Sequence, residues 1–263
     1  MTESVACEYT VQGRGPALVL IHGIRASRQT WSNLLPVLTP HFTVITYDLR
    51  GHGTSPRSVS GEFQPFGLDE LVADLAALLD ALEIDQVHMA GHSLGGMIGP
   101  AYARAHPSRV LSLGLLSTAA FRTDDDSSKV QGVVKAMEER GIENVLPTLT
   151  DRWFTDSFIE NHPEIVENRL KQVIATDADV FLNVFRIYAG TEMSPWLHEV
   201  NTPSLVLTGE NDGGCNPRLN QQISDAMPDA KLVILPGYKH SLLLEAGETV
   251  AKEMLAFIKA LGD

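Results

Sequence analysis

The stretch Val87–Gly96, which reads VHMAGHSLGG, is the part of the chain from which the fold is inferred. It holds a short apolar run typical of a buried strand, then Gly91-His92-Ser93-Leu94-Gly95 in the GxSxG pattern, then the start of a helix. A serine on so tight a turn is held with its hydroxyl exposed, and small neighbours leave room for the turn. The first amides of the following helix point back at the serine, where negative charge develops during acyl transfer. The stretch therefore predicts a nucleophile beside one oxyanion donor.

The composition limits the classes of partner. At 263 residues the chain is long enough for one large α/β domain or a domain with an insertion. Its formal net charge of -13 argues against nucleic acid and against anionic membranes. No apolar run approaches the ~20 residues that span a bilayer, and the opening MTESVACEYT does not resemble a secretory signal. Cys7 and Cys215 are far apart and outside any metal-ligand spacing. We therefore expect a cytoplasmic protein with two free thiols and no metal.

Outside residues 121–200, segments with strand and helix patterns alternate along the chain. This alternation predicts a doubly wound, mostly parallel sheet of seven to eight strands with helices on both faces, an α/β fold. Besides the strand before Ser93, strands are expected at 4–11, 17–23, 42–47, 110–116, 204–209 and 231–235, and helices at 29–38, 68–84, 94–105, 218–227 and 248–261. Pro100 lies inside the helix after Ser93, where we expect a kink and not a break because Gly96 has no side chain to crowd the proline ring.

Residues 121–200 contain no run that resembles a buried strand. Helical spacing recurs there at 130–140, 142–150, 163–176 and 179–189. The predicted organisation is a core domain formed by 1–120 and 201–263, with a helical cap at 121–200 inserted between its two parts.

An activated serine needs a base within hydrogen-bond reach and a carboxylate that orients this base. Asp212 follows the strand SLVLTG, and His240 follows the strand KLVIL. The carboxyl ends of parallel strands form the crevice in which an open sheet binds ligands. The order Ser93, Asp212, His240 is the one expected for a GxSxG turn in a doubly wound sheet. Asp48 and Glu210 also end strands, and on the residues alone they stay open as alternatives for the orienting acid.

The segments HGIRAS, DLRGHGTS, GHSLGG, GENDGGCNP and GYKHSLLLE, in this order, resemble the α/β-hydrolase superfamily over nearly the whole chain. The resemblance implies that Ser93, Asp212 and His240 are a catalytic triad and that the amide of Ile24 completes an oxyanion hole with the amide of Leu94. It also implies an additional first strand, for which the N-terminal segment is too short. No cofactor is implied.

The remaining histidines are expected to be structural. His92 precedes the nucleophile and is expected to pack beside the turn, since one base suffices for a triad. His22 and His52 belong to tight turns. The others stand alone, without acidic or cysteine partners at ligand spacing, so no metal site is expected.

A serine nucleophile excludes the relatives that form an ester on an aspartate, the epoxide hydrolases and haloalkane dehalogenases. The segments RWFTDSFIENHPEIV and IYAGTEMSPWLHEVNTPSLVLTGE resemble 3-oxoadipate enol-lactonases and related small-molecule lactonases. The resemblance implies a cofactor-independent serine esterase or lactonase that acts on a small carboxylic ester or lactone, in the breakdown of an aromatic or heterocyclic compound. Arg25 is a candidate partner for a substrate carboxylate, with a solvated surface arginine as the alternative. Trp153 and Phe154 either line the pocket or pack inside the cap.

Two other functions stay open at this stage. A carbon-carbon bond hydrolase of a ring-cleavage product uses the same triad, although such relatives usually carry Asn where this chain has His92. A small-molecule receptor can keep the triad and act by binding alone. The expected partner is a small-molecule substrate in each case, and a homo-oligomer is also left open.

Overall fold

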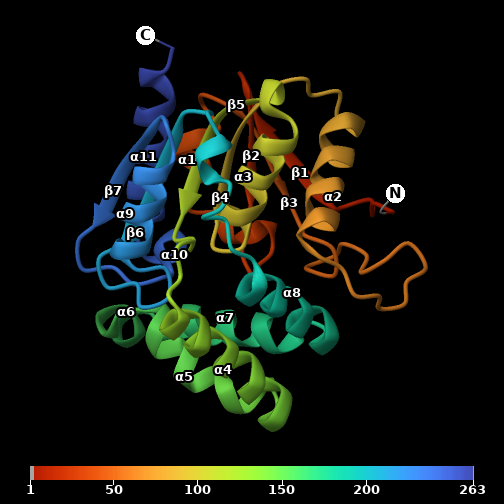
Figure 1. Cartoon of the computed structure of the whole chain (residues 1–263), viewed down its shortest axis with the longest axis vertical. Coiled ribbons are helices and arrows are strands. Elements are labelled where there is room, and N and C mark those ends of the chain that lie inside the picture. Colours follow the sequence, from red (N-terminus) through yellow and green to blue (C-terminus); the bar gives the residue numbers. More distant parts are fainter. Residues whose placement is uncertain (1–2, 263) are drawn as a thin grey trace.

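The structure, a computed structural model, describes residues 3–262. Its described part holds one seven-stranded sheet in the order β1-β3-β2-β4-β5-β6-β7, in which β1 is antiparallel to β3 and all other pairs are parallel (Figure 1). The strands are β1 (Tyr9–Gly13), β2 (Ala17–Ile21), β3 (Thr43–Tyr47), β4 (Val87–His92), β5 (Val110–Leu116), β6 (Ser204–Gly209) and β7 (Ala230–Leu235). The predicted doubly wound, mostly parallel sheet is confirmed. The winding reverses between β2 and β4, and a crevice forms at such a switch point.

Helices cover both faces of the sheet, because the central strands are apolar on both sides. In β2, Val19 and Ile21 belong to one core, while Leu18 and Leu20 belong to the other. Such continuous burial is typical of a parallel strand. The helices of the core domain are α1 (Leu35–Leu38), α2 (Leu68–Ala81), α3 (Gly95–Ala105), α9 (Pro217–Ala226), α10 (Leu242–Glu245) and α11 (Gly247–Ala260), with short 3-10 helices at Arg28–Trp31 (η1) and Pro107–Arg109 (η2).

Several boundaries differ from the sequence prediction. The helix expected at 29–38 is two short pieces, η1 and α1, because Pro36 lacks an amide and is accommodated in the first turn of a new helix. The first strand begins at Tyr9 and not at residue 4, and the amide of Val5 instead donates to the Asp74 carboxylate over 2.8 Å. Helix α10 was not expected. The helix α3 runs through Pro100 without a break, and the kink there stays a prediction.

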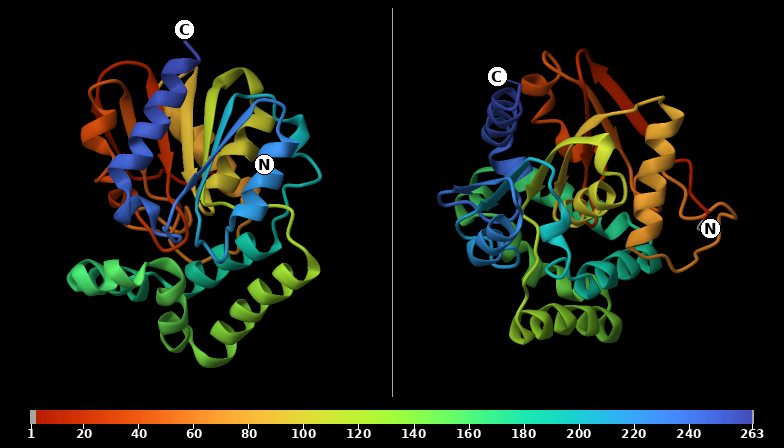
Figure 2. Two further views of the ribbon diagram at one scale, coloured as in Figure 1. Left: turned by 90° about the vertical axis from the view of Figure 1, so that its left-hand side faces the viewer. Right: turned by 45° about the horizontal axis from the view of Figure 1, so that its top comes forward.

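Between β5 and β6 the described residues form five α-helices and the 3-10 helix η3 (Leu197–Glu199), and we call residues 121–200 the cap. The five α-helices are α4 (Asp124–Arg140), α5 (Ile142–Trp153), α6 (Asp156–Asn161), α7 (Pro163–Ala175) and α8 (Ala178–Gly190). Helix α4 begins six residues earlier than predicted, because Thr123 and Asp126 form a capping box at its start. Helix α6 was missed, and Thr155 caps it by accepting from the amide of Phe158 over 3.2 Å. The cap lies across one end of the sheet, opposite the end where the C-terminus emerges (Figure 2). None of the described helices is long and apolar enough to cross a membrane.

Asp48, at the end of β3, holds two loops together next to the switch point. Its carboxylate is 1% exposed and accepts from the amide of Arg28 over 2.7 Å, from the amide of Thr54 over 3.1 Å and from the Arg28 guanidinium. The turn after β2 and the loop after β3 are thereby tied to each other. A buried group with this many donors is costly to remove, because each donor is left without a partner.

We predict that Asp48→Ala lowers the free energy of unfolding by roughly 2–4 kcal/mol, because two amides and a guanidinium lose their acceptor. Urea denaturation measures this loss. The matched control is Asp80→Ala, which removes an ion pair between Arg109 and a carboxylate that is 65% exposed. Such a surface pair contributes at most about 1 kcal/mol. Equal losses in the two variants would contradict the structural role of Asp48.

Candidate active site

Ser93 lies on the turn between β4 and α3 in a strained backbone conformation. Its φ is 55°, in the left-handed region that residues other than glycine rarely adopt. Its amide donates to the Leu116 carbonyl of β5 over 2.9 Å, which fixes the turn to the sheet. A side chain at Gly91 would collide with the Gly95 carbonyl, so the chain can reverse this tightly only with glycine there. The turn presents the Ser93 side chain at the carboxyl edge of the sheet.

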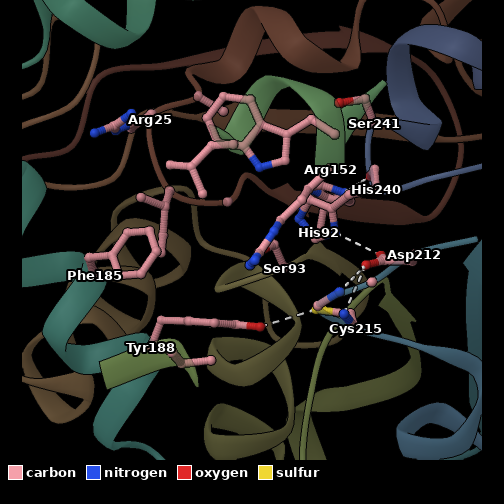
Figure 3. Close-up of a pocket in the computed structure, with 18 of the residues that line it drawn as sticks. Arg25, His92, Ser93, Arg152, Phe185, Tyr188, Asp212, Cys215, His240 and Ser241 are labelled. Carbon is pink, nitrogen blue, oxygen red and sulfur yellow. Dashed lines mark hydrogen bonds and ion pairs between the residues drawn. The ribbon is translucent and has the colours of Figure 1, made fainter. Parts of the chain in front are cut away.

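Two further strands bring an acid and an imidazole to the same edge. Asp212 follows β6, and His240 follows β7. The Nδ1 of His240 lies 2.7 Å from Oδ2 of Asp212, whose other oxygen accepts from the amides of Gly214 and Cys215 over 3.0 and 2.8 Å. Ser93, Asp212 and His240 all line one cavity, and Figure 3 shows them around its polar side. The structure thus brings together three residues that are far apart in the sequence.

The charges of the pair are set by their contact. Burial alone would lower the pKa of His240, but the charge of the Asp212 carboxylate and its hydrogen bond raise this pKa well above its usual value of 6.5. Burial would raise the pKa of Asp212, yet the attraction of His240 and the two loop amides keep it below its ordinary value. Asp212 is therefore an ionised hydrogen-bond acceptor at neutral pH, and it fixes the proton of the imidazole on Nδ1.

Two backbone amides beside Ser93 have no acceptor among the described residues. One belongs to Ile24, in the turn after β2, and the other to Leu94, directly before α3. The turn passes close to the serine, since a Cβ on Gly23 would lie 2.9 Å from the Cβ of Ser93. Unpaired amides at this position are donors for an oxyanion. Ile24 and Leu94, the two residues that the family resemblance implied, thus each have an unpaired amide near the serine turn, and their role as oxyanion donors stays a prediction.

His92 contacts the imidazole of His240 directly. The two ring centroids are 4.9 Å apart, and Nε2 of His92 lies 3.0 Å from the His240 carbonyl, so it carries the proton and donates. Burial and the neighbouring His240 lower the pKa of His92 to about 3. His92 is a neutral donor that holds the loop of His240, a role more specific than the packing expected from the sequence.

Asp212, Cys215 and His240 are a group of residues whose donor atoms could bind a metal. Their ligand atoms lie within 4.8 Å of one another. Nδ1 of His240 and Oδ2 of Asp212 already share a hydrogen bond, so a metal ion would have to displace the proton between them. Cys215 also approaches the cap, because its Sγ lies 3.2 Å from the Tyr188 hydroxyl.

The cavity has a volume of about 460 Å³ and lies between the sheet edge and the cap. Trp153 lines it, as one reading of the sequence predicted. Phe154 is fully buried and stacks on Phe158 with ring centroids 5.5 Å apart, so its side chain packs inside the cap. Arg25 also lines the cavity, but it is 2% exposed and its guanidinium lies over the Phe181 ring, 3.1 Å from the centroid. Burial and the neighbouring Arg169 lower the pKa of Arg25 to about 8.

The cap contributes cationic residues that the sequence analysis did not single out. They are Arg122, Lys129, Arg152 and Arg169, and all line the cavity. No sequence motif marks these positions. Basic residues on the polar face of an amphipathic helix usually face solvent, so their presence in the sequence does not indicate a cavity. Their relation to Ser93 depends on how the cap is seated on the sheet.

Comparison with known proteins agrees with this geometry. The family described as alpha/beta hydrolase fold matches residues 16–247. The chain belongs to the α/β-hydrolase family. Over 212 residues it is 31% identical to 3-oxoadipate enol-lactonase 2 of Acinetobacter baylyi, which covers 80% of this chain and 77% of the relative.

Two further proteins are similar to nearly the whole chain. The (E)-2-((N-methylformamido)methylene)succinate hydrolase of Acinetobacter baylyi is 25% identical over 263 residues, which cover 98% of this chain and 96% of the relative. The solved enol-lactonase of Burkholderia xenovorans LB400 has the same fold, with a TM-score of 0.87 over 96% of both chains at 23% identity. These relatives support a hydrolase, and the resemblance to enol-lactonases seen in the sequence is confirmed.

We predict that the imidazoles of His240 and His92 titrate far apart. In an NMR titration of histidine-labelled protein, His240 should lose its proton above pH 6.5, and His92 should stay neutral down to about pH 3. Asp212→Asn should move the midpoint of His240 below 6.5, because burial then acts without the compensating carboxylate. An unchanged midpoint in this variant would show that Asp212 does not control the base.

Proposed function

We propose that this protein is a cofactor-independent serine hydrolase that cleaves a small carboxylic ester or lactone through an acyl-enzyme on Ser93. The observation that carries the proposal is the 2.7 Å contact between Asp212 and His240 in the cavity that Ser93 also lines, beside two unpaired amides. Each part of an acyl-transfer site is represented: nucleophile, base, orienting acid and oxyanion donors.

The first half of the reaction forms the acyl-enzyme. In its neutral form, with the proton on Nδ1, His240 takes the hydroxyl proton of Ser93 at Nε2 while the serine oxygen attacks the ester carbon. The amides of Ile24 and Leu94 donate to the oxygen that becomes negative, and Asp212 stabilises the imidazolium. His240 then gives its proton to the leaving alkoxide, which departs as an alcohol. In a lactone, this alcohol stays attached to the acyl group.

The second half restores the serine. Water gives a proton to His240 as its oxygen attacks the acyl carbon, and the same two amides bind the second oxyanion. The Ser93 oxygen leaves and takes the proton back from His240. The products are a carboxylic acid and an alcohol, joined in one hydroxy acid when the substrate is a lactone.

The size of the cavity and the relatives favour a small substrate. A volume of about 460 Å³ lies within the range of small-molecule sites. The relatives named above are an enol-lactonase and a hydrolase of a substituted succinate. The resemblance to enol-lactonases is also the reason why we propose that the reaction of this chain belongs to the breakdown of an aromatic or heterocyclic compound.

The charge around the cavity favours a substrate that carries a carboxylate. Five cationic residues line it, namely Arg25, Arg122, Lys129, Arg152 and Arg169, against the described carboxylates of Asp126 and Asp212. Asp212 is bonded to His240, and Asp126 is paired with Arg218. A positive cavity in a chain of net charge -13 concentrates an anion at this one place on the protein.

We predict that Ser93→Ala lowers kcat by ~10³-fold or more, on the scale of nucleophile removal in other triads. The turnover of aryl esters and lactones measures this loss. A vinylogous 1,5-diketone is assayed beside them, because a carbon-carbon bond hydrolase would cleave it. In the unmodified protein, an organophosphonate should add to Ser93, as mass mapping would show. Full activity in Ser93→Ala, or labelling elsewhere, would refute the mechanism.

We predict that Arg25→Met and Arg152→Gln each raise KM roughly 10-fold for the nitrophenyl half-ester of a short dicarboxylic acid, since a hydrogen bond to a charged group contributes about 1.5–3 kcal/mol. The nitrophenyl ester of the monocarboxylic acid of equal length is the matched substrate, and its KM should not change. Arg186→Met removes a surface arginine paired with Glu138 and is the control variant. If neither cavity variant raises KM for the half-ester more than for the ester of the monocarboxylic acid, Arg25 and Arg152 do not bind a substrate carboxylate.

A further inference from the structure

The oxyanion loop, residues 23–26, is strained and needs support from outside. Arg25 has a φ of 58°, in the left-handed region. For a residue with a side chain this conformation costs on the order of 1–3 kcal/mol, and it persists only when surrounding contacts fix it. The loop carries the Ile24 amide, so its shape decides where one oxyanion donor points.

Three successive carbonyls of this loop are held by donors. The Gly23 carbonyl accepts from Nδ1 of His22 over 2.8 Å and from the amide of Ala26 over 3.3 Å. Nε2 of His22 accepts from the amide of Leu49 over 3.0 Å, so the proton of this imidazole is on Nδ1. The next two carbonyls, of Ile24 and Arg25, both accept from the guanidinium of Arg169, the first over 3.4 Å.

Arg169 comes from the cap, on helix α7, 144 residues along the chain from Arg25. Because peptide groups are planar, fixing a carbonyl also fixes the amide on the other side of its plane. His22 thus orients the peptide that carries the Ile24 amide. Arg169 fixes the next two peptides, on both sides of the strained residue, and prevents the loop from relaxing into an unstrained turn.

Arg169 also places positive charge beside the loop. Burial lowers its pKa to about 10, which leaves it charged at neutral pH. Among the described residues no carboxylate forms an ion pair with it. Its charge is therefore not neutralised by a carboxylate beside the oxyanion loop, and a fixed positive charge near a developing negative charge stabilises it.

We propose that Arg169 is a positioning residue by which the cap assembles the oxyanion hole: its guanidinium bridges two carbonyls of the oxyanion loop and keeps the strained loop in the shape in which His22 orients the Ile24 amide. The proposal rests on the acyl-enzyme mechanism given above. According to this proposal, the oxyanion hole is fully formed only when α7 packs against the core domain. A substrate that binds well to the cap is then the one that meets a finished hole.

The cap contacts the other catalytic loops as well. The carbonyl of Trp153, at the end of α5, accepts from the amide of Ser241 over 2.9 Å, next to His240. Tyr188 of α8 contacts Cys215 beside Asp212. These contacts reach the loops of the base and the acid, whereas Arg169 alone among the described cap residues bonds to carbonyls of the oxyanion loop.

The test compares Arg169→Met with Arg169→Lys on a neutral nitrophenyl ester, so that binding of a substrate carboxylate does not enter. In Arg169→Met, kcat should fall roughly 100-fold with little change in KM, near the lower end of the loss seen when an oxyanion donor is removed. Ki for an aryl trifluoromethyl ketone, whose adduct with a serine places an oxyanion in the hole, should rise by the same factor. Arg169→Lys keeps the charge but replaces the planar fork, whose two nitrogens each donate to one carbonyl, by a single nitrogen, and it should recover little of the loss.

Arg186→Met, a surface arginine on α8, is the matched control and should keep the kcat and Ki of the unmodified protein. Melting temperatures of all variants show whether a substitution lowers the stability of the fold. A loss of the oxyanion hole should change kcat and Ki by the same factor, whereas a general disturbance of the fold should not. Arg169→Lys or Arg169→Met with unchanged kcat and Ki would overturn the proposal. An increase in KM for the acidic half-ester alone would do so too, and would make Arg169 a substrate ligand.

The result of the Arg169 test can be distinguished from the result of the Ser93 test. If the phosphonate labels Ser93 and Ser93→Ala is inactive, the acyl-enzyme mechanism holds whatever the Arg169 variants show. If Ser93 is neither labelled nor required, the mechanism fails first, and the role of Arg169 fails with it.

Discussion

The active-site geometry depends on one steric constraint, the tight reversal of the chain between β4 and α3. The turn puts Ser93 into a left-handed backbone conformation, and a side chain at Gly91 would collide with the Gly95 carbonyl. The same turn carries the serine side chain and the free amide of Leu94, directly before α3. Because the strands are parallel, the loops after β2, β6 and β7 end at the same edge of the sheet, so the oxyanion loop, Asp212 and His240 all surround this turn.

Electrostatics then gives different roles to chemically identical side chains. His22, His92 and His240 lie around the serine turn. Burial lowers the pKa of His22 and of His92, and each of these neutral rings donates one hydrogen bond to a backbone carbonyl of a catalytic loop. Only His240 contacts a carboxylate, and only its pKa is raised. One ion contact therefore separates the base from two structural histidines.

The cap contacts every loop around the serine turn. It bonds to the turn after β2 through Arg169, to the loop of His240 through Trp153 and to the loop of Asp212 through Tyr188. It also brings most of the positive charge to the cavity. Residues that line the cavity and residues that contact the loops around Ser93 thus belong to the same few helices. A cap that can change its sequence without altering the sheet allows one core to serve different substrates.

The sequence by itself determined the mostly parallel sheet, the strands along the chain and the choice of Ser93, Asp212 and His240 as candidates, because these depend on local patterns: apolar runs, glycine turns and a serine between small residues. Prediction was weaker where local signals compete, as at residues 29–38, where Pro36 divides one expected helix into two. Only the tertiary structure showed that Arg25 is buried against Phe181 and that Arg169 bonds to the oxyanion loop. Those contacts join segments that are more than a hundred residues apart, and no periodicity along the chain encodes which helix face meets which loop.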